Sequence, residues 1–246
     1  MRNIKITLQY NGKNYCGWQK QPDSMGIQGN LEYAVNKITG EKVNINGSGR
    51  TDAGVHALAQ VANFQTESKI PASKFPDALN SQLPKDISVI YAEEVDMEFH
   101  SRYSAVGKRY RYLIYNSRYR NPIIKDISYQ VKYDLDVEKM KREAKSLIGT
   151  HDFKGFMSSG SSVENTVRTI SDVEIIQDGN LIIMEFEGNG FLYNMVRILS
   201  GTLVDIGRGK INNSMREIID SKSRKQAGHT APAHALFLKK VFYPEN

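Results

Sequence analysis

Cysteine is nearly absent from the sequence, since Cys16 is the only one in 246 residues. A chain with one cysteine forms no internal disulfide, which excludes the disulfide-stabilised secreted scaffolds. Long apolar runs are missing too, because no stretch reaches the 18 residues typical of a membrane-spanning helix. The first ten residues alternate apolar and polar side chains, unlike the apolar core of a signal peptide. We therefore expect a soluble, cytoplasmic protein without a membrane partner.

Metal-ligand spacing is absent as well. The five histidines include no pair at the His-x-x-x-His spacing that zinc enzymes use on a helix. The sequence therefore predicts no metal site. Charge of one sign is only in modest excess, because 33 Lys and Arg face 27 Asp and Glu, a net charge of +6. Such an excess suits an anionic partner such as nucleic acid, but it bears on association and not on fold.

The spacing of apolar residues changes several times between the strand period and the helix period. A period of two over residues 1–10 predicts a first strand, and Gly40 ends a predicted helix with Leu31 and Val35 on its apolar face. Two apolar runs around Asp178 and Gly179 predict a β-hairpin. Further strands are predicted at 43–45, 58–64, 87–94, 109–114 and 236–242, and further helices at 71–83, 137–147 and 192–203.

Both halves of the chain thus mix hairpins or strands with single helices. This order favours an α+β fold with a largely antiparallel sheet over a doubly wound parallel fold. A boundary near residues 104–108, with no low-complexity linker, divides the chain. We expect residues 1–105 to form an N-terminal α+β subdomain and residues 106–246 a C-terminal one.

A glycine-rich loop around Asp52 is the first candidate for chemistry. Gly47, Gly49 and Gly54 let the backbone take positive φ and let another molecule approach closely. Arg50 would keep the nearby carboxylate ionised at neutral pH, as a nucleophile requires. The alternative, which the spacing alone favours, is a turn whose aspartate caps the following backbone amides.

The segment from residue 102 to residue 120 contains no Asp or Glu but many basic and aromatic side chains. Its cations are Arg102, Lys108, Arg109, Arg111, Arg118 and Arg120, and its tyrosines are Tyr103, Tyr110, Tyr112, Tyr115 and Tyr119. Arginines can neutralise phosphates, and tyrosine rings give unpaired bases a stacking surface. An ordinary strand with a solvated face is the alternative, but six cations without an acid favour contact with nucleic acid.

A glycine loop, Gly188 to Gly190, leads into a predicted helix that carries Arg197 beside apolar residues. A half-buried arginine needs a carboxylate partner, because an unpaired buried charge is costly. Asp52 is a candidate for that partner. An arginine that faces solvent from the helix surface is the alternative.

These motifs combine into one pattern. Residues 49–57, Gly-Arg-Thr-Asp-Ala-Gly-Val-His-Ala, resemble the signature of the TruA family of tRNA pseudouridine synthases. Residues 10–12, 17–19 and 28–32 resemble the family's opening, and 99–105, 108–112, 151–153 and 191–197 follow in the family's order. The resemblance covers essentially the whole chain. Gly26, Gly155 and Ala235 depart from the residues that the family often has there, which leaves room for altered substrate choice.

The resemblance implies the pseudouridine synthase fold, with two α/β subdomains sharing a large, mostly antiparallel sheet and helices on one side. It implies an isomerase that forms pseudouridine in the anticodon stem-loop of tRNA, at positions 38 to 40. Such an enzyme breaks the N1–C1′ glycosidic bond, turns the uracil and joins C5 to C1′, without redox change, cofactor or metal. It also implies a homodimer with tRNA bound across both subunits.

By the same resemblance, Asp52 is the essential carboxylate, and attack on C1′, attack on C6 and removal of a sugar proton all stay open. Arg197 would pair with Asp52, and Tyr110 would stack on the uracil and is a candidate for proton transfer from C5. Arg50 would help to extrude the nucleotide, since a base in a stem must be flipped out. Phosphate contacts are expected from Arg102, Lys108, Arg109, Arg111 and Lys210. An RNA-binding protein without catalysis is the alternative.

Overall fold

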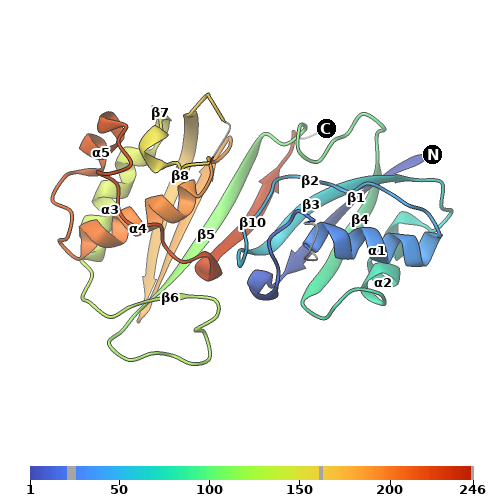
Figure 1. The fold of residues 1–246 in the computed structure, drawn as a ribbon, viewed down its shortest axis with the longest axis horizontal. Helices are drawn as coiled ribbons and strands as arrows, with labels where there is room; N and C mark the ends of the chain where they lie inside the picture. The colour runs from blue at the N-terminus through green and yellow to red at the C-terminus, as the bar shows by residue number, and fades with distance from the viewer. Residues whose placement is uncertain (21–25, 161–162, 245–246) are drawn as a thin grey trace. The chain divides into compact units, whose positions relative to one another are not determined.

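The computed structural model describes residues 1–20, 26–160 and 163–244. The chain divides into two compact units: unit 1 comprises Met1–Val106 and Phe237–Asn246, and unit 2 comprises Gly107–Leu236 (Figure 1). The division falls next to the expected boundary at residues 105 and 106. The last residues belong to unit 1, although the sequence placed them in the second subdomain. The assignment of separate roles to the two parts stays a prediction.

Unit 1 is built on an antiparallel sheet that one parallel strand extends. Its strands are β1 (Arg2–Tyr10), β2 (Asn46–Gly47), β3 (His56–Thr66), β4 (Ile87–Val95) and β10 (Leu236–Phe242). Strand β1 lies between β4 and β3 and runs antiparallel to both, while β10 pairs with β3 in parallel. Ile4, Ile6 and Leu8 are fully buried on one face of β1, which is the face that the period of two predicted.

The two helices of unit 1 are α1 (Ile27–Thr39) and α2 (Phe75–Asn80), and they contact each other. Helix α2 also packs against β4 (Figure 1). A loop covers buried asparagines of the sheet, because Asn3 Nδ2 donates to the carbonyls of Asp96 and Phe99, both at 2.9 Å. The amide of Ser101 donates to Asn63 Oδ1 at 2.9 Å. The loop at 96–101 is thus tied to the sheet by hydrogen bonds.

Unit 2 contains a second, mainly antiparallel group of strands. They are β5 (Gly107–Asn116), β6 (Tyr129–Val131), β7 (Gly149–Asp152), β8 (Val167–Asp178) and β9 (Leu181–Gly188). Their order is β5, β9, β8, β7, and the short β6 pairs with β5 in parallel. Strands β8 and β9 form the hairpin predicted around Asp178 and Gly179, with Asp178 opposite Leu181 and Gly179 at φ +55°.

Three helices accompany this sheet: α3 (Val137–Ala144), α4 (Met195–Gly207) and α5 (Met215–Ser221). Helix α4 is buried at almost every position and contacts both α3 and β5. Short 3₁₀ turns complete the described elements, at Gly12–Asn14, Ala72–Lys74, Lys145–Leu147, Lys154–Phe156 and Ala233–Ala235. The α+β class and the mostly antiparallel pairing predicted from the sequence are confirmed.

Two element predictions were wrong. The expected strand at 43–45 does not form, because the amide of Ile45 faces Glu32 Oε1 at 3.5 Å and only Asn46 and Gly47 pair with β3. The expected helix at 71–83 is shortened to a 3₁₀ turn and the six residues of α2. Helix α5 was missed, although Ser214 and Glu217 form a capping box that marks its start.

Candidate active site

The loop that carries Asp52 joins β2 to β3 and is held by hydrogen bonds from the N-terminal part of the chain. The amide of Trp18 donates to the carbonyl of Thr51 at 3.0 Å. The hydroxyls of Tyr10 and Thr51 share a hydrogen bond of 2.8 Å. Both contacts fix the residue immediately before Asp52. The N-terminal motifs noted in the sequence therefore contact the loop directly, although they precede it by about forty residues in the chain.

Two glycines let these segments approach closely. A Cβ on Gly12 would lie 1.9 Å from the carbonyl oxygen of Val55, and one on Gly17 would lie 2.4 Å from that of Thr51. Such distances exclude any side chain unless the backbone moves. The amide of Gly12 also donates to His56 Nδ1 at 3.0 Å. The chain on both sides of Asp52 is thus packed directly against residues 12–18.

A buried polar network completes the support. Gln60, which is fully buried, accepts a hydrogen bond from Ser48 Oγ at 2.5 Å and donates to the carbonyl of Gly49 at 3.0 Å. Its Nε2 also donates to the Tyr10 hydroxyl at 3.4 Å. Burial raises the pKa of Tyr10 to about 12, against the opposing hydrogen bonds with Thr51 and Gln60. The phenol is therefore neutral and serves as a structural hydrogen-bonding group.

Arg50 and Asp52 differ in exposure. Arg50 is exposed at the start of the loop, and Asp52 is half-buried two residues later. Gly54 follows with φ of +79°, and the amide of Val55 donates to the carbonyl of Asp52 at 3.1 Å. This closes a tight turn directly after the carboxylate. The backbone carbonyl of Asp52 closes this turn, and capping of the following amides by its carboxylate, the alternative from the sequence, stays a prediction.

Tyr110 lies on β5 in unit 2, on the same face of the strand as Tyr112 and Ile114. Its side chain is half-buried, and its ring meets the ring of Phe191 edge to face, with centroids 5.1 Å apart and planes at 84°. Phe191 belongs to the segment that leads into α4. The Tyr110 ring is therefore positioned by the same segment that positions Arg197.

Arg197 is half-buried near the start of α4 and is fixed by two hydrogen bonds. Its Nε donates to the carbonyl of Ala231 at 2.8 Å and its Nη1 to Asn194 Oδ1 at 2.7 Å. Asn194 adopts the left-handed conformation, with φ of 60°. The amide of Ala231 in turn donates to the carbonyl of Arg197 at 3.1 Å. The segment around residue 231 thus sets the direction of the guanidinium group.

Tyr112 is a neighbour of Arg197 that the sequence did not single out as a site residue. Its hydroxyl donates to the carbonyl of Pro232 at 2.9 Å. Burial raises the pKa of Tyr112 well above its usual value, and the nearby charges of Tyr129 and Arg197 act in opposite directions on it. The sequence contained a pattern that could have identified Tyr112 as a neighbour of the site. Alternate residues of a strand share a face, so Tyr112 lies on the same face as Tyr110 and Ile114.

The other face of β5 is occupied by ion pairs. Arg109 contacts Glu187 at 2.7 Å and Asp172 at 3.1 Å, and it lies 3.5 Å from Glu185. Arg111 contacts Glu185 at 2.8 Å. The Glu185 side chain is only 5% exposed. Both arginines therefore already interact with carboxylates, and a phosphate would have to replace them.

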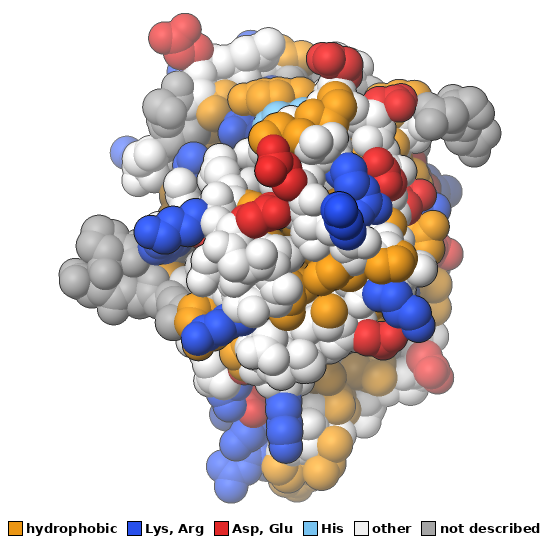
Figure 2. Space-filling model, turned by 90° about the vertical axis from the view of Figure 1, so that its right-hand side faces the viewer, with side chains coloured by type: hydrophobic (Ala, Val, Ile, Leu, Met, Phe, Trp, Pro, Cys, Tyr) orange, Lys and Arg blue, Asp and Glu red, His pale blue; other side chains and the backbone are white. Residues whose placement is uncertain are grey.

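The remaining expected RNA contacts are more accessible. Arg102 is exposed, with its guanidinium 5.7 Å from the centre of the Tyr103 ring. Lys108 is half-buried at the start of β5, opposite Gly188. Lys210 is exposed, with its Nζ 3.6 Å from Asp205 Oδ2. Figure 2 shows basic and acidic side chains interspersed on one face of the molecule.

Metal and membrane features can be stated for the described residues only. Within residues 1–20, 26–160 and 163–244, no three His, Cys, Asp or Glu side chains gather in a way that could hold a metal ion. None of the helices in that part of the chain combines the length and hydropathy needed to cross a bilayer.

The sequence matches one family over most of its length. A model of the family described as tRNA pseudouridine synthase covers residues 6–104 and 144–244. The chain belongs to the tRNA pseudouridine synthase family. Asp52 and Arg197 lie within the matched ranges, whereas Tyr110 lies in the stretch between them. The resemblance stated from the motifs is therefore confirmed.

Curated relatives agree with this assignment. A tRNA pseudouridine synthase A from Acetivibrio thermocellus is 51% identical over 244 residues, which cover 99% of this chain and 100% of the relative. One from Thermoanaerobacter pseudethanolicus is 50% identical with the same coverage. Among solved structures, a crystal structure of a Cbf5-Nop10-Gar1 complex matches with a TM-score of 0.38 and 12% identity. That match covers 95% of this chain and 57% of the other chain.

The three expected catalytic residues are thus each placed within their own unit. Asp52 belongs to unit 1, and Tyr110 and Arg197 belong to unit 2. The segment 191–197 connects the last two, since Phe191 contacts Tyr110 and Asn194 holds Arg197. The pairing of Asp52 with Arg197 stays a prediction. The support of the Asp52 loop by Tyr10, Thr51 and Gln60 was not foreseen from the sequence.

Proposed function

We propose that this member of the tRNA pseudouridine synthase family forms pseudouridine in the anticodon stem-loop of tRNA, at positions 38 to 40. The reaction breaks the bond between uracil N1 and ribose C1′ and joins C5 to C1′. C5 loses a proton and N1 gains one, so the product is an isomer and no electrons are exchanged with a partner. Family membership over most of the chain, with Asp52 on a loop held at both sides, supports this proposal.

Asp52 is the essential carboxylate in this proposal. The contacts of Tyr10 and Trp18 with Thr51, and of Gly12 with the chain at residues 55 and 56, hold its backbone in one place. A reactive group gains rate from being held in position before the substrate arrives. Attack on C1′, attack on C6 and removal of a sugar proton are three routes that a carboxylate here can serve.

Arg197 and Tyr110 complete the proposed catalytic set. Arg197 pairs with Asp52 and keeps the carboxylate ionised, because a neighbouring positive charge favours the charged form. Tyr110 stacks on the uracil and takes part in moving the C5 proton. Its contact with Phe191 holds the ring for stacking.

The target nucleotide has to leave its stem before it reacts, at a cost of a few kcal/mol. Stacking on Tyr110 offsets about 1–3 kcal/mol of this cost. Arg50, which is exposed, enters the vacated place in the stem. Arg102 and Lys108 contact phosphates and so position the tRNA without reading its sequence. Arg109 and Arg111 can contribute to tRNA binding only if a phosphate replaces the carboxylates that they contact.

The test of this function is Asp52→Asn, which keeps the shape of the side chain and removes its charge. We expect pseudouridine formation on an unmodified tRNA transcript to fall by at least about 10⁴-fold, the order of loss seen when a catalytic carboxylate or nucleophile is removed. The affinity for tRNA should change little, because the carboxylate does not attract phosphate. Both are measured on the same preparation, by nucleotide analysis and by filter binding.

Asp77→Asn is the matched control, because Asp77 is an exposed aspartate of unit 1 in helix α2. It should leave both the rate and the affinity unchanged. Full turnover in the Asp52 variant would refute the role of Asp52. A wild-type protein that binds tRNA without forming pseudouridine would refute the proposed function as a whole.

We further propose that the enzyme is a cytoplasmic homodimer that binds tRNA across both subunits. Sedimentation equilibrium should then give twice the chain mass of 27.8 kDa. A mass that stays at one chain across micromolar concentrations would contradict this part of the proposal alone.

A further inference from the structure

A second candidate site lies in unit 2, near Tyr112 and the segment 231–232 that contacts Arg197. It is a pocket of about 330 Å³, within the size range of small-ligand sites. Its lining residues are Tyr115, Arg120, Asn121, Lys125, Ser128, Tyr129, Gln130 and His234. Seven of these eight fall between the two ranges that the family model matches. Most of the lining thus comes from the stretch between the matched ranges, whereas His234 belongs to a matched range.

The lining carries positive charge without an acid. Arg120 and Lys125 are exposed, and neither forms an ion pair within the described part of the chain. No Asp or Glu is among the eight lining residues. This contrasts with Arg109 and Arg111 earlier in the same segment, which contact carboxylates. The charge of the pocket is therefore available to an anion.

Two tyrosine rings form part of the wall, and one of them is held by a chain of polar groups that ends at a buried aspartate. The hydroxyl of Tyr129 lies 3.2 Å from His229 Nε2, and His229 Nδ1 lies 3.0 Å from Asp205 Oδ2. Asp205 is 1% exposed. The contact of His229 with the carboxylate orients the imidazole, and the imidazole in turn holds the ring of Tyr129 through its hydroxyl. The other ring, Tyr115, stands at the end of β5.

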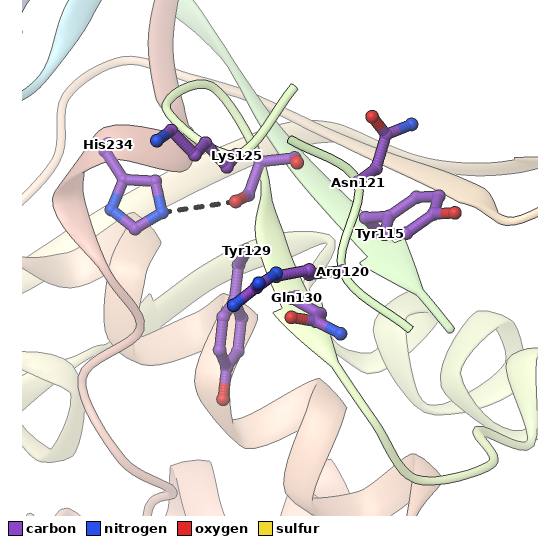
Figure 3. Close-up of a pocket in the computed structure, with 8 residues that line it drawn as sticks. Tyr115, Arg120, Asn121, Lys125, Tyr129, Gln130 and His234 are labelled. Atoms are coloured by element: carbon purple, nitrogen blue, oxygen red, sulfur yellow. Dashed lines mark hydrogen bonds between the residues drawn. The ribbon is translucent and has the colours of Figure 1, made fainter. Parts of the chain in front are cut away.

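Two amide groups of the lining are each held on one side. Asn121 Oδ1 accepts a hydrogen bond from the amide of Ile123 at 3.0 Å, and Gln130 Nε2 donates to the carbonyl of Ser117 at 3.2 Å. Among the described residues, Asn121 Nδ2 and Gln130 Oε1 make no hydrogen bond. They offer one donor and one acceptor. Figure 3 shows Arg120 and Gln130 between Tyr129 and His234 on one side and Tyr115 and Asn121 on the other.

We propose that this pocket binds an unpaired nucleotide of the tRNA other than the target uridine. Arg120 and Lys125 bind its phosphate, a tyrosine ring stacks on its base, and the two amides pair with the base edge. Cations, stacking rings and edge-reading amides together are what recognition of single-stranded RNA uses. An acidic peptide would use the cations but neither the rings nor the amide pair.

The bound nucleotide differs from the target because of the geometry of β5. Tyr115 is five residues beyond Tyr110, which is about 17 Å along a strand, and an odd separation places the two rings on opposite faces. One nucleotide cannot reach both. This inference rests on the proposed function, which supplies tRNA as the ligand. The chemistry of the pocket by itself would also bind a free nucleotide.

The first experiment removes the two cations together, as Arg120→Gln with Lys125→Gln. The control pair is Lys141→Gln with Arg216→Gln, which removes two exposed cations of helices α3 and α5. We expect the pocket pair to weaken tRNA binding about tenfold and to reduce the salt dependence of log Kd by about 2, because two phosphate contacts are lost. The control pair should leave both unchanged. Equal effects from the two pairs would overturn the proposal.

The second experiment locates the nucleotide. Gln130 is replaced by the photoreactive residue p-benzoylphenylalanine, and the product cross-linked to a tRNA transcript is mapped by primer extension. A cross-link to one unpaired nucleotide outside the target position supports the proposal. A cross-link to the target uridine, or to a second copy of the chain, overturns it.

Titration with uridine 5′-monophosphate separates the two sources of the ligand. Binding of this nucleotide that the Arg120 and Lys125 changes abolish, without any change in tRNA affinity, would overturn the tRNA source. Measurement of pseudouridine in the same samples keeps the two proposals apart. Product formed by the pocket variant with an unchanged affinity refutes the pocket alone, whereas absence of product from the wild-type protein refutes the proposed function.

Discussion

At the scale of single residues, the candidate active site depends on two glycines that lack a side chain. Gly12 and Gly17 bring the N-terminal segment into contact with the backbone on both sides of Asp52. Tyr10 and Gln60 then fill the space behind the loop with hydrogen bonds. These contacts hold the backbone on both sides of the carboxylate.

We predict that Gly12→Ala reduces activity by about 100-fold or more, because an added Cβ would displace the backbone at Val55 and a shift of about 1 Å at a catalytic group is sufficient for that loss. The free energy of unfolding should fall by about 1–3 kcal/mol from overpacking. Urea unfolding and pseudouridine formation measure the two effects.

Gly40→Ala serves as the comparison, because Gly40 ends α1 with φ of +76° and has open space around it. It should lose about 1–2 kcal/mol through backbone strain and keep its specific activity. Equal activities in the two variants would show that the close contact at Gly12 does not position Asp52.

At the scale of elements, β5 separates two kinds of side chain by its period of two. Tyr110 and Tyr112 share one face, and Arg109 and Arg111 share the other. The arginines meet Glu185 and Glu187 of the neighbouring β9. A basic segment in the sequence thus becomes, in the sheet, a face of tyrosines and a face of ion pairs.

We predict that Arg111→Met lowers the free energy of unfolding by about 1–3 kcal/mol, because the 5%-exposed Glu185 loses its 2.8 Å contact with Arg111. Arg216→Met removes an exposed ion pair on α5 and should change stability by about 0.5 kcal/mol or less. The salt dependence of tRNA binding should stay unchanged in the Arg111 variant. A decrease of about 1 in its slope would instead restore Arg111 as a phosphate contact.

At the scale of the whole molecule, the net charge of +6 is a weak guide to RNA binding. Basic and acidic side chains alternate on the face seen in Figure 2, and several arginines are neutralised within the fold. The cations proposed to contact RNA lie in both units: Arg50, Arg102, Lys108, Arg120 and Lys125. We infer that tRNA affinity depends on these positions and not on the overall excess of charge.

We predict that the logarithm of the tRNA association constant falls with the logarithm of salt concentration with a slope of about −4, as the four proposed phosphate contacts of Arg102, Lys108, Arg120 and Lys125 require. Filter binding between 50 mM and 200 mM KCl, at fixed pH, measures the slope. A flat response would contradict an interface based on phosphates.

Local patterns were sufficient to predict much of the fold. The hairpin at Asp178 and Gly179, the helix ended by Gly40 and the last strand all depend on residues that are close in the chain. Contacts between neighbours decided these elements, so their period and turn residues were visible. The strand expected at 43–45 failed because Glu32, thirteen residues away, faces the Ile45 amide. Distant partners of this kind leave no local pattern.

The sequence by itself determined the family, the candidate carboxylate Asp52 and the order of most elements, because short motifs and hydrophobic periods are properties of neighbouring residues. Only the tertiary structure decided that residues 10–18 hold the Asp52 loop, that Arg109 and Arg111 pair with carboxylates, and that Tyr129 is held by His229 and the buried Asp205. Each of these depends on groups far apart in the chain, and their pairing is set by how the sheets and helices pack.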